Sequence, residues 1–157
     1  MEKSELLLDC LIAELNQRAD VAELRIEDLQ GKGLNEDQCK FLLSYCPENV
    51  LIIYGTLAPG KPNHRKVSHI RGEWKPAVIK GGKLDKRGWG AEMGFDGFTP
   101  CQAADQKDID AMILYAGELM DNYAVLDEFE GAGYQRILAR FELENGKSGV
   151  GYIYAVR

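Results

Sequence analysis

Residues 50–60 have the sequence VLIIYGTLAPG. The run from Val50 to Tyr54 is continuously apolar and rich in β-branched residues, which predicts a strand that is covered on both faces. A turn from Tyr54 to Leu57 follows, and Gly55 allows its backbone to come close to a ligand. Consecutive N–H groups in such a turn can bind an anion, although turns of this kind more often only reverse the chain. We therefore expect a buried strand that ends in a candidate carboxylate-binding loop.

A second distinctive segment is LDEFEG at residues 126–131, where Gly131 predicts the end of a helix. Tyr123, Leu126 and Glu130 are spaced by three and then four residues, so they share one helix face. Burying an ionised carboxylate is costly unless it is compensated, so a Glu on this face is either structurally paired or chemically employed. Burial would also raise its pKa toward the range that suits a general base.

Two interpretations of Glu130 stay open at this point. In the structural one, Glu130 lies at a frayed helix end and reaches water or pairs with Arg136. In the chemical one, Glu130 is a catalytic acid and base, and this interpretation gains weight only if the candidate carboxylate-binding loop lies beside it. Asp121 and Glu128, with Asp127 nearby, occupy another face of the helix, which we expect to be solvated.

The size and charge of the chain exclude several classes of protein. Its 157 residues suffice for one domain with an ordinary core. The formal net charge of −6 lies entirely in residues 1–49, which hold 5 Lys and Arg against 11 Asp and Glu, whereas residues 50–157 hold 14 of each. Nucleic acids and anionic membrane surfaces are therefore poor candidate partners. With no apolar run near the roughly 20 residues of a membrane helix and no signal-peptide pattern, we expect a soluble, cytoplasmic protein.

The four cysteines and two histidines do not form a metal-binding pattern. No cysteine pair has CxxC spacing, and His64 and His69 have no Cys or Glu neighbour at ligand spacing. In a cytosolic chain the cysteines are expected to stay reduced. We predict no structural metal and no disulfide, and we expect His64 to be a local hydrogen-bonding residue rather than a catalyst.

The first third of the chain is predicted to be helical and the rest to be rich in strands. The helix after Ser4 is expected to bury Leu6, Leu7, Cys10, Leu11 and Leu15. Residues 21–29 fit neither periodicity, and Asn35 is expected to cap a second helix that Pro47 ends. A later helix is expected between a cap at Asp121 and residue 131. Further strands are expected at residues 72–79, 81–84, 109–119, 137–143 and 150–156.

Taken together, these motifs resemble the gamma-glutamylcyclotransferase-like family, especially its gamma-glutamylamine cyclotransferase branch. The similarity rests on YGTL at residues 54–57 with GKPNH at 60–64, and on LDEFEG with YQR at 134–136. It extends in order across about residues 50–157. The resemblance implies an α+β fold, a small mixed β-barrel flanked by helices, to which residues 1–49 add an acidic helical extension. It also implies an enzyme without a cofactor that releases 5-oxoproline and a free amine or amino acid from a small gamma-glutamyl substrate.

The resemblance implies roles for individual residues as well. Glu130 matches the family's catalytic Glu and would act as the general acid and base. Arg136 is expected to be a structural ion-pair partner. The backbone of the turn would hold the substrate α-carboxylate, and two tyrosines would line the pocket or position the substrate. The substrate-binding residues implied in this way are Tyr54, Gly55, Thr56, Leu57 and Tyr134.

Several questions stay open from the sequence. The extension at residues 1–49 could pack over the barrel, mediate oligomerisation, cover the site or be a solvated segment without function. The same fold could also bind a small carboxylate without catalysis or recruit a partner protein, although a buried negative charge at Glu130 disfavours this alternative. The leaving group would contact loops such as residues 88–99, whose conformation cannot be derived from sequence. The identity of the leaving amine and the oligomeric state are therefore left open.

Overall fold

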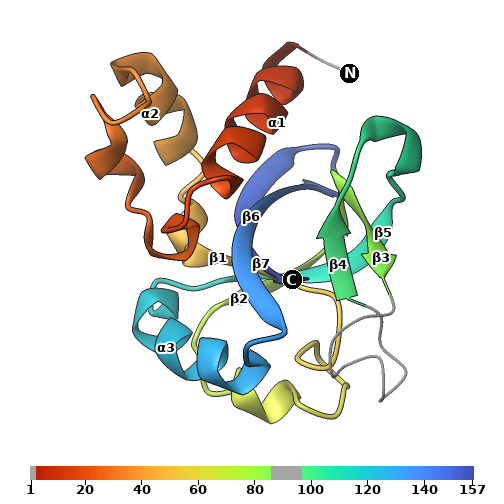
Figure 1. The fold of residues 1–157 in the computed structure, drawn as a ribbon. Coiled ribbons are helices and arrows are strands. Elements are labelled where there is room, and N and C mark those ends of the chain that lie inside the picture. Colours follow the sequence, from red (N-terminus) through yellow and green to blue (C-terminus); the bar gives the residue numbers. More distant parts are fainter. Residues whose placement is uncertain (1–2, 86–96) are drawn as a thin grey trace.

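A closed barrel of five strands forms the centre of the computed structural model, which describes residues 3–85 and 97–157 (Figure 1). β1 and β7 close the barrel as a parallel pair, with Leu51 opposite Tyr152 and Ile52 opposite Ile153. The other neighbouring strands are antiparallel. The predicted small mixed barrel is therefore confirmed. In order around the barrel, the strands are β1 (Val50–Ile53), β5 (Ile109–Tyr115), β2 (Glu73–Ile79), β6 (Tyr134–Leu143) and β7 (Ser148–Val156).

Two short strands extend the barrel wall at β7. β3 (Gly82–Asp85) and β4 (Gly97–Pro100) form an antiparallel pair, and β4 joins β7 in parallel where Phe98 lies opposite Ala155. Of the predicted loop at residues 88–99, residues 88–96 lie outside the described residues, whereas residues 97–99 belong to the strand β4 and not to a loop.

The strand β1 is buried on both faces, as its continuous apolar sequence predicts. None of its four side chains is more than 3% exposed. Because side chains alternate along a strand, Ile52 points into the barrel with Ile153, which lies opposite it in β7. Leu51 points outward with Tyr152, whose ring contacts the ring of Tyr123 in a neighbouring helix at 5.7 Å between centroids. The barrel interior and the surrounding helices thus bury opposite faces of one strand.

The N-terminal segment is helical, as predicted, and contains α1 (Lys3–Asn16), α2 (Glu36–Leu43) and three short 3-10 helices, η1 (Val21–Glu23), η2 (Ile26–Leu29) and η3 (Pro47–Asn49). Asn35 caps α2 as expected: its side chain accepts a hydrogen bond from the N–H of Gln38, whose side chain accepts one in return from the N–H of Asn35.

The buried face of α1 differs from the predicted one. Leu11 and Leu15 are buried as expected, but Leu6 and Leu7 are 52% and 46% exposed, and Cys10 is exposed too. The residues that pack into the core are Leu8, Leu11, Ile12 and Leu15. Three successive leucines at positions 6–8 fit several helix faces equally well, so contact with the barrel, not periodicity, selects the face that is buried.

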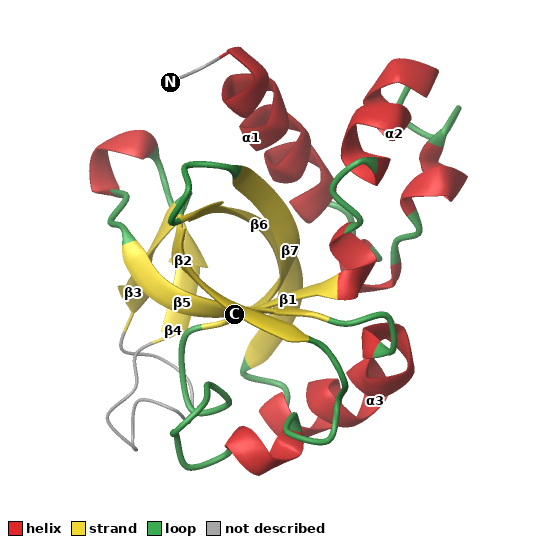
Figure 2. Ribbon diagram, turned by 180° about the vertical axis from the view of Figure 1, so that it is seen from behind, coloured by secondary structure: helices red, strands yellow, loops and turns green. Residues whose placement is uncertain are grey.

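The helix α1 and the 3-10 helices η1 and η3 pack on the outside of the barrel at β6 and β7, and α2 packs against η2 (Figures 1 and 2). The side-chain amide of Asn16 donates to the carbonyl of Leu138 at 2.8 Å and accepts from its N–H at 2.9 Å. The hydroxyl of Tyr152 donates to the carbonyl of Val21 at 2.9 Å. Residues 1–49 therefore pack over the barrel, which was one of the four alternatives for this extension. The domain boundary at residue 50 stays a prediction.

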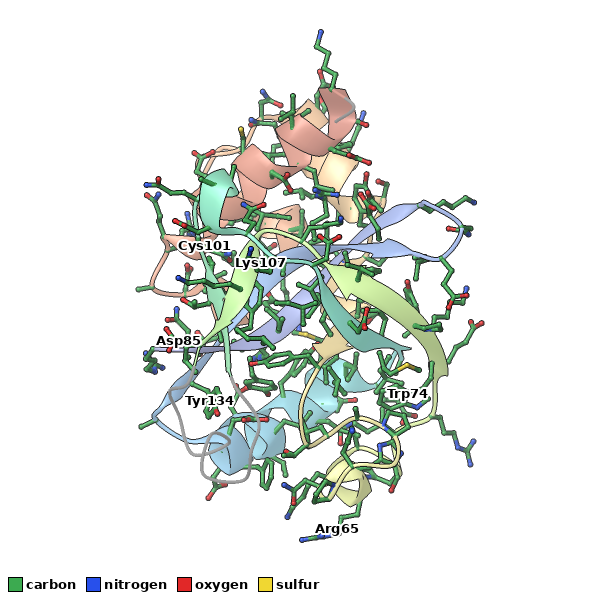
Figure 3. All side chains as sticks on the ribbon, turned by 90° about the vertical axis from the view of Figure 1, so that its right-hand side faces the viewer. Arg65, Trp74, Asp85, Cys101, Lys107 and Tyr134 are labelled. Carbon is green, nitrogen blue, oxygen red and sulfur yellow. The ribbon has the colours of Figure 1, made fainter. Side chains whose placement is uncertain are left out.

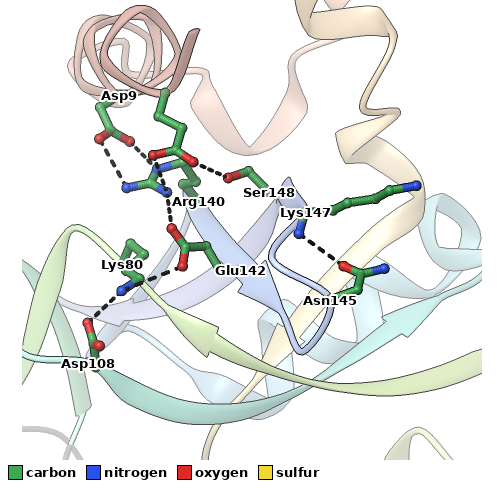
Figure 4. A network of polar contacts seen from close by, with 9 residues as sticks. Asp9, Lys80, Asp108, Arg140, Glu142, Asn145, Lys147 and Ser148 are labelled. Atoms are coloured by element: carbon green, nitrogen blue, oxygen red, sulfur yellow. Dashed lines mark hydrogen bonds and ion pairs between the residues drawn. The ribbon is translucent and has the colours of Figure 1, made fainter. Parts of the chain in front are cut away.

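A buried arginine adds an ionic attachment between α1 and the barrel (Figure 4). Arg140 in β6 is only 4% exposed, and its guanidinium donates to the carboxylate of Asp9 at 2.7 Å and to that of Glu142 at 3.2 Å. Glu142 also lies 3.8 Å from the ammonium of Lys80, which is 3.0 Å from the carboxylate of Asp108. Alternating charges therefore compensate the burial of Arg140, which would otherwise be costly.

The third long helix, α3 (Leu119–Glu130), contacts β6 and η3 on the barrel wall (Figure 2). The prediction that Asp121 caps it was wrong: the helix begins at Leu119 with Glu118 at the N-cap position, three residues earlier. Asp121 lies in the first turn, where its negative charge interacts favourably with the helix dipole. Gly131 ends the helix as predicted, with a φ of 82° and its N–H donating to the carbonyl of Asp127. None of the helices described here is long and apolar enough to cross a membrane.

Replacing Gly151 with Ala should weaken the closure of the barrel. A Cβ atom at this position would lie 2.6 Å from a side-chain carbon of Val50 and 2.8 Å from its carbonyl oxygen, which belongs to the backbone and cannot move aside. We expect Gly151→Ala to lower the free energy of unfolding by about 1–3 kcal/mol in urea titrations.

Gly133→Ala is the matched control, because a Cβ there meets no described atom within 4 Å. Its expected change is within about 0.5 kcal/mol. Equal stability of the two variants would show that β1 and β7 do not approach as closely as described.

Candidate active site

Tyr54 joins the strands β7 and β4 at one open end of the barrel, which is called its mouth below. It follows β1, and its hydroxyl donates to the carbonyl of Tyr154 in β7 and accepts from the N–H of Phe98 in β4, both at 2.7 Å. Burial raises the pKa of this phenol well above its usual range, so it stays protonated and keeps both hydrogen bonds. Tyr54 also lines two clefts of about 710 and 730 Å³, but neither Glu130, Tyr134 nor residues 55–57 line these two clefts.

The predicted carboxylate-binding loop leaves the barrel at this mouth. The carbonyls of Gly55, Thr56 and Leu57 all accept hydrogen bonds from later residues of the same loop. Their three N–H groups, in contrast, donate to no acceptor in the described part of the chain. Successive N–H groups that lack protein acceptors are the feature by which backbone binds anions.

Gly55 is not required by the packing of this loop. Its φ lies outside the left-handed region, and a Cβ atom added to it would meet no described atom within 4 Å. The fold itself would therefore tolerate a side chain here. Open space beside unbonded N–H groups is consistent with a glycine kept for the approach of a ligand.

Glu130 is buried in the last turn of α3. Tyr123, Leu126 and Glu130 share the buried face, as the helical spacing predicts, and Glu130 is 8% exposed. Burial, with a smaller contribution from the negative charge of Asp127, raises the pKa of Glu130 from its ordinary value of 4.5 to about 7. A carboxyl group with this pKa can accept and return a proton near neutral pH.

Asp127, and not Glu130, is the partner of Arg136. The guanidinium of Arg136 donates to both carboxylate oxygens of Asp127, at 2.9 and 3.2 Å, and lies 3.8 Å from the ring centroid of Tyr123. The hydroxyl of Tyr154 donates to the same carboxylate at 2.7 Å. Arg136 is thus an ion-pair partner as expected, but the alternative in which it neutralises Glu130 does not apply.

Tyr134 begins β6 directly after the turn that follows α3, and it is 8% exposed. The charge of Glu130 and the phenol of Tyr134 both add to the raised pKa of Tyr54, because each of these groups lies near Tyr54. Figure 3 shows Tyr134 beside α3, at the end of the molecule opposite α1. The structure therefore brings the predicted residues from β1, α3 and β6 to one mouth of the barrel.

His64 was expected to make a local hydrogen bond, but the sequence alone did not identify its partner in this loop. It lies in the 3-10 helix η4 (His64–Lys66), and its Nδ1 is 2.9 Å from the carbonyl oxygen of Leu57. The motif Pro62-Asn63-His64 after the turn was the available signal, and it correctly indicated a local hydrogen bond. His69 contacts Asn122 in α3 and lies outside this loop.

Within residues 3–85 and 97–157, no group of three or more His, Cys, Asp or Glu side chains is arranged to hold a metal ion. The four cysteines are free thiols, of which Cys39 alone is buried.

Comparison of the sequence with known protein families identifies the family of this chain. Residues 51–157, more than half of the chain, match the family described as Gamma-glutamyl cyclotransferase, AIG2-like. The chain is a member of this family. A search of curated proteins found no match.

Solved structures support the gamma-glutamyl cyclotransferase-like fold. YkqA from Bacillus subtilis is similar with a TM-score of 0.53 and 22% identity over 69% of this chain, and the match covers 36% of YkqA. A structure titled Gamma-glutamyl cyclotransferase gives a TM-score of 0.52 and 16% identity over 69% of this chain and 66% of its own. An Arabidopsis thaliana protein, At5g39720.1, whose structure was solved in solution, has a TM-score of 0.50 and 18% identity. The match covers 69% of this chain and 68% of the Arabidopsis protein. At these identities the likeness concerns the fold, and the match spans only about a third of YkqA.

The raised pKa of Glu130 makes a prediction about the stability of this cyclotransferase-like domain. Between pH 4.5 and about 7 the native state binds a proton that the unfolded chain releases, so the stabilising effect of the protonated group is lost as pH rises through 7. Glu130→Gln should therefore raise the free energy of unfolding at pH 8 by about 1–3 kcal/mol, and by much less at pH 5.

Urea titrations at the two pH values measure this difference. Glu128→Gln is the control, because Glu128 is exposed on the same helix and its replacement should matter little at either pH. If Glu130→Gln were equally destabilising at pH 5 and pH 8, the carboxylate would be a structural hydrogen-bond acceptor and not a group strained by burial.

Proposed function

We propose that this protein releases 5-oxoproline and a free amine or amino acid from a small gamma-glutamyl substrate, with Glu130 as general acid and base. The observation that carries the proposal is a buried carboxyl group with a pKa of about 7 at the same barrel mouth as three backbone N–H groups that have no acceptor among the described residues. Membership of the cyclotransferase family supports it.

In the proposed reaction the substrate's own α-amine attacks its γ-carbonyl carbon. Glu130 first takes a proton from the α-ammonium group, which frees the nitrogen lone pair for attack. A new C–N bond closes the five-membered ring, Glu130 returns the proton to the leaving nitrogen, and the original amide C–N bond breaks. The ring nitrogen, which still carries two protons, gives one of them up through Glu130 to the released amine. The ring amide is then neutral and the amine leaves as an ammonium ion. Protons and an acyl group are the only things transferred, and one carboxyl group can carry the proton both ways.

The loop would supply the orientation that this ring closure needs. The N–H groups of Gly55, Thr56 and Leu57 would bind the α-carboxylate and so hold the adjacent amine against the γ-carbonyl. Tyr54 would line the pocket, and Tyr134 would position the substrate or Glu130. Glu130 and Tyr134 both lie close enough to Tyr54 to raise its pKa.

The proposal is tested by measuring 5-oxoproline release with mass spectrometry on gamma-glutamyl amino acids, gamma-glutamyl amines, ε-linked gamma-glutamyl-lysine and glutathione. Glu130→Gln should lower kcat/KM by about 10²–10⁴-fold, because the proton carrier is lost. The wild-type kcat/KM should fall about tenfold per pH unit below pH 7 as Glu130 becomes protonated.

This panel also decides whether the gamma-glutamylamine branch, which stays a prediction, is the correct one, because it names the leaving amine. A folded protein that releases no 5-oxoproline from any substrate of the panel, or a Glu130→Gln variant that is fully active, would contradict the proposed function. Silence combined with binding of 5-oxoproline would favour the alternative of a non-catalytic carboxylate-binding module.

Gly55→Ala provides a second test, aimed at the loop. Because the fold tolerates a Cβ here, stability should change by no more than about 0.5 kcal/mol, whereas the added methyl group should obstruct a bound carboxylate. We expect KM to rise about tenfold or more, corresponding to about 1.4 kcal/mol of lost binding. Gly117→Ala, also in open space, is the control with unchanged kinetics. Unchanged kinetics of Gly55→Ala would place the substrate carboxylate elsewhere.

A further inference from the structure

The carbonyl groups of the candidate carboxylate-binding loop, residues 55–57, are held by three donors. The N–H of Ala58 donates to the carbonyl of Gly55 at 3.1 Å, and the N–H of Asn63 donates to that of Thr56 at 2.9 Å. The third donor is the Nδ1 of His64, which lies 2.9 Å from the carbonyl oxygen of Leu57. Two of the three donors are backbone groups, so His64 is the one side chain in this set.

Because the peptide group is planar, a hydrogen bond that fixes the direction of a carbonyl also fixes the direction of the N–H in the same peptide group. In a trans peptide the C=O of one residue and the N–H of the next point in opposite directions. Fixing the carbonyl of Thr56 therefore fixes the N–H of Leu57, and fixing the carbonyl of Gly55 fixes the N–H of Thr56. The hydrogen bonds on the carbonyl side thus set the directions of N–H groups that have no protein acceptor in the described chain.

His64 acts on this arrangement through the peptide between Leu57 and Ala58. Its side chain holds the carbonyl of that peptide, and the N–H of the same peptide holds the carbonyl of Gly55. The effect of His64 therefore continues to the N–H of Thr56, in the middle of the loop. A single imidazole thus orients two peptide groups, Leu57–Ala58 directly and Gly55–Thr56 through the N–H of Ala58.

The imidazole is itself anchored to the barrel. His64 is half-buried, and its ring lies 5.4 Å from the ring of Trp74 in β2, measured between centroids. Because a carbonyl oxygen can only accept, Nδ1 must carry the proton in this contact. The ring thus presents a fixed N–H donor to the loop from a position tied to the barrel wall.

We propose that His64 is a positioning residue that holds the Gly55–Leu57 loop in the conformation that binds the substrate carboxylate, an inference that rests on the proposed function. It does not touch the reacting atoms. Its contribution is to binding, which is the same in the ground state and in the transition state, so its loss should raise KM more than it lowers kcat.

The chemistry of the amide side chains provides a sharp test. Asn places its side-chain nitrogen as many bonds from the backbone as the Nδ1 of His, whereas Gln places it at the distance of Nε2. His64→Asn therefore keeps a donor for the carbonyl of Leu57, His64→Gln moves it away, and His64→Ala removes it. All three lose the ring contact with Trp74, so a difference among them reports the hydrogen bond alone.

We expect His64→Ala and His64→Gln to raise KM for the best substrate of the panel about tenfold, with kcat within about threefold of the wild type. His64→Asn should restore KM to within about threefold. The dissociation constant of 5-oxoproline, which carries the same carboxylate, should follow the same order in isothermal titration calorimetry. Melting temperatures establish that each variant is folded, and if His64→Ala is not, the Asn and Gln pair still decides.

The outcomes separate this inference from the proposed function. A wild-type protein that turns over substrate while all three variants have unchanged KM overturns the role of His64 alone. The same holds if the Asn and Gln variants are equally impaired, because the effect then comes from the ring contact. A wild-type protein that neither releases nor binds 5-oxoproline overturns both.

Discussion

The parallel pairing of β1 with β7 is the constraint on which the rest of the structure depends. Parallel strands carry their C-terminal ends to the same edge, so the loop after β1 emerges next to the end of β7. Tyr54 secures this edge by bonding across to the Tyr154 carbonyl and to the Phe98 N–H. The same Tyr154 reaches Asp127 in α3 with its hydroxyl. Closure of the barrel therefore brings Tyr54, at the start of the loop, and Asp127 of α3 to the same end of β7.

The charges around α3 explain why its two acidic side chains behave differently. Asp127 is half-exposed and takes the guanidinium of Arg136, which is also stacked on Tyr123 and so held in place. That cation is therefore committed to Asp127. For Glu130 the dominant influences are burial and the negative charge of Asp127, and both favour its protonated form. Arg136 thus pairs with Asp127 and not with Glu130, and burial raises the pKa of Glu130 to about 7.

Much of this arrangement could be predicted from the sequence, and the failures have physical reasons. The buried strand β1 and the face shared by Tyr123, Leu126 and Glu130 follow from strong periodic patterns. Periodicity could not select the face of α1, where adjacent leucines satisfy several faces. It also could not choose between Asp127 and Glu130 as the partner of Arg136, because that contact depends on how β6 starts after the turn. The assignment of the site residues to a reaction stays a prediction until activity is measured.

The attachment of α1 to β6 has a consequence for biosynthesis. Asp9 and Asn16 contact their partners, Arg140 and Leu138, more than a hundred residues later, and the barrel closes when β1 pairs with β7. Contacts of such long sequence separation form slowly, because a large loop must be ordered first. A ribosome-bound chain would therefore display the apolar face of its first helix until nearly the last strand has emerged. This topology makes the nascent chain a candidate client for chaperones, in spite of its small size.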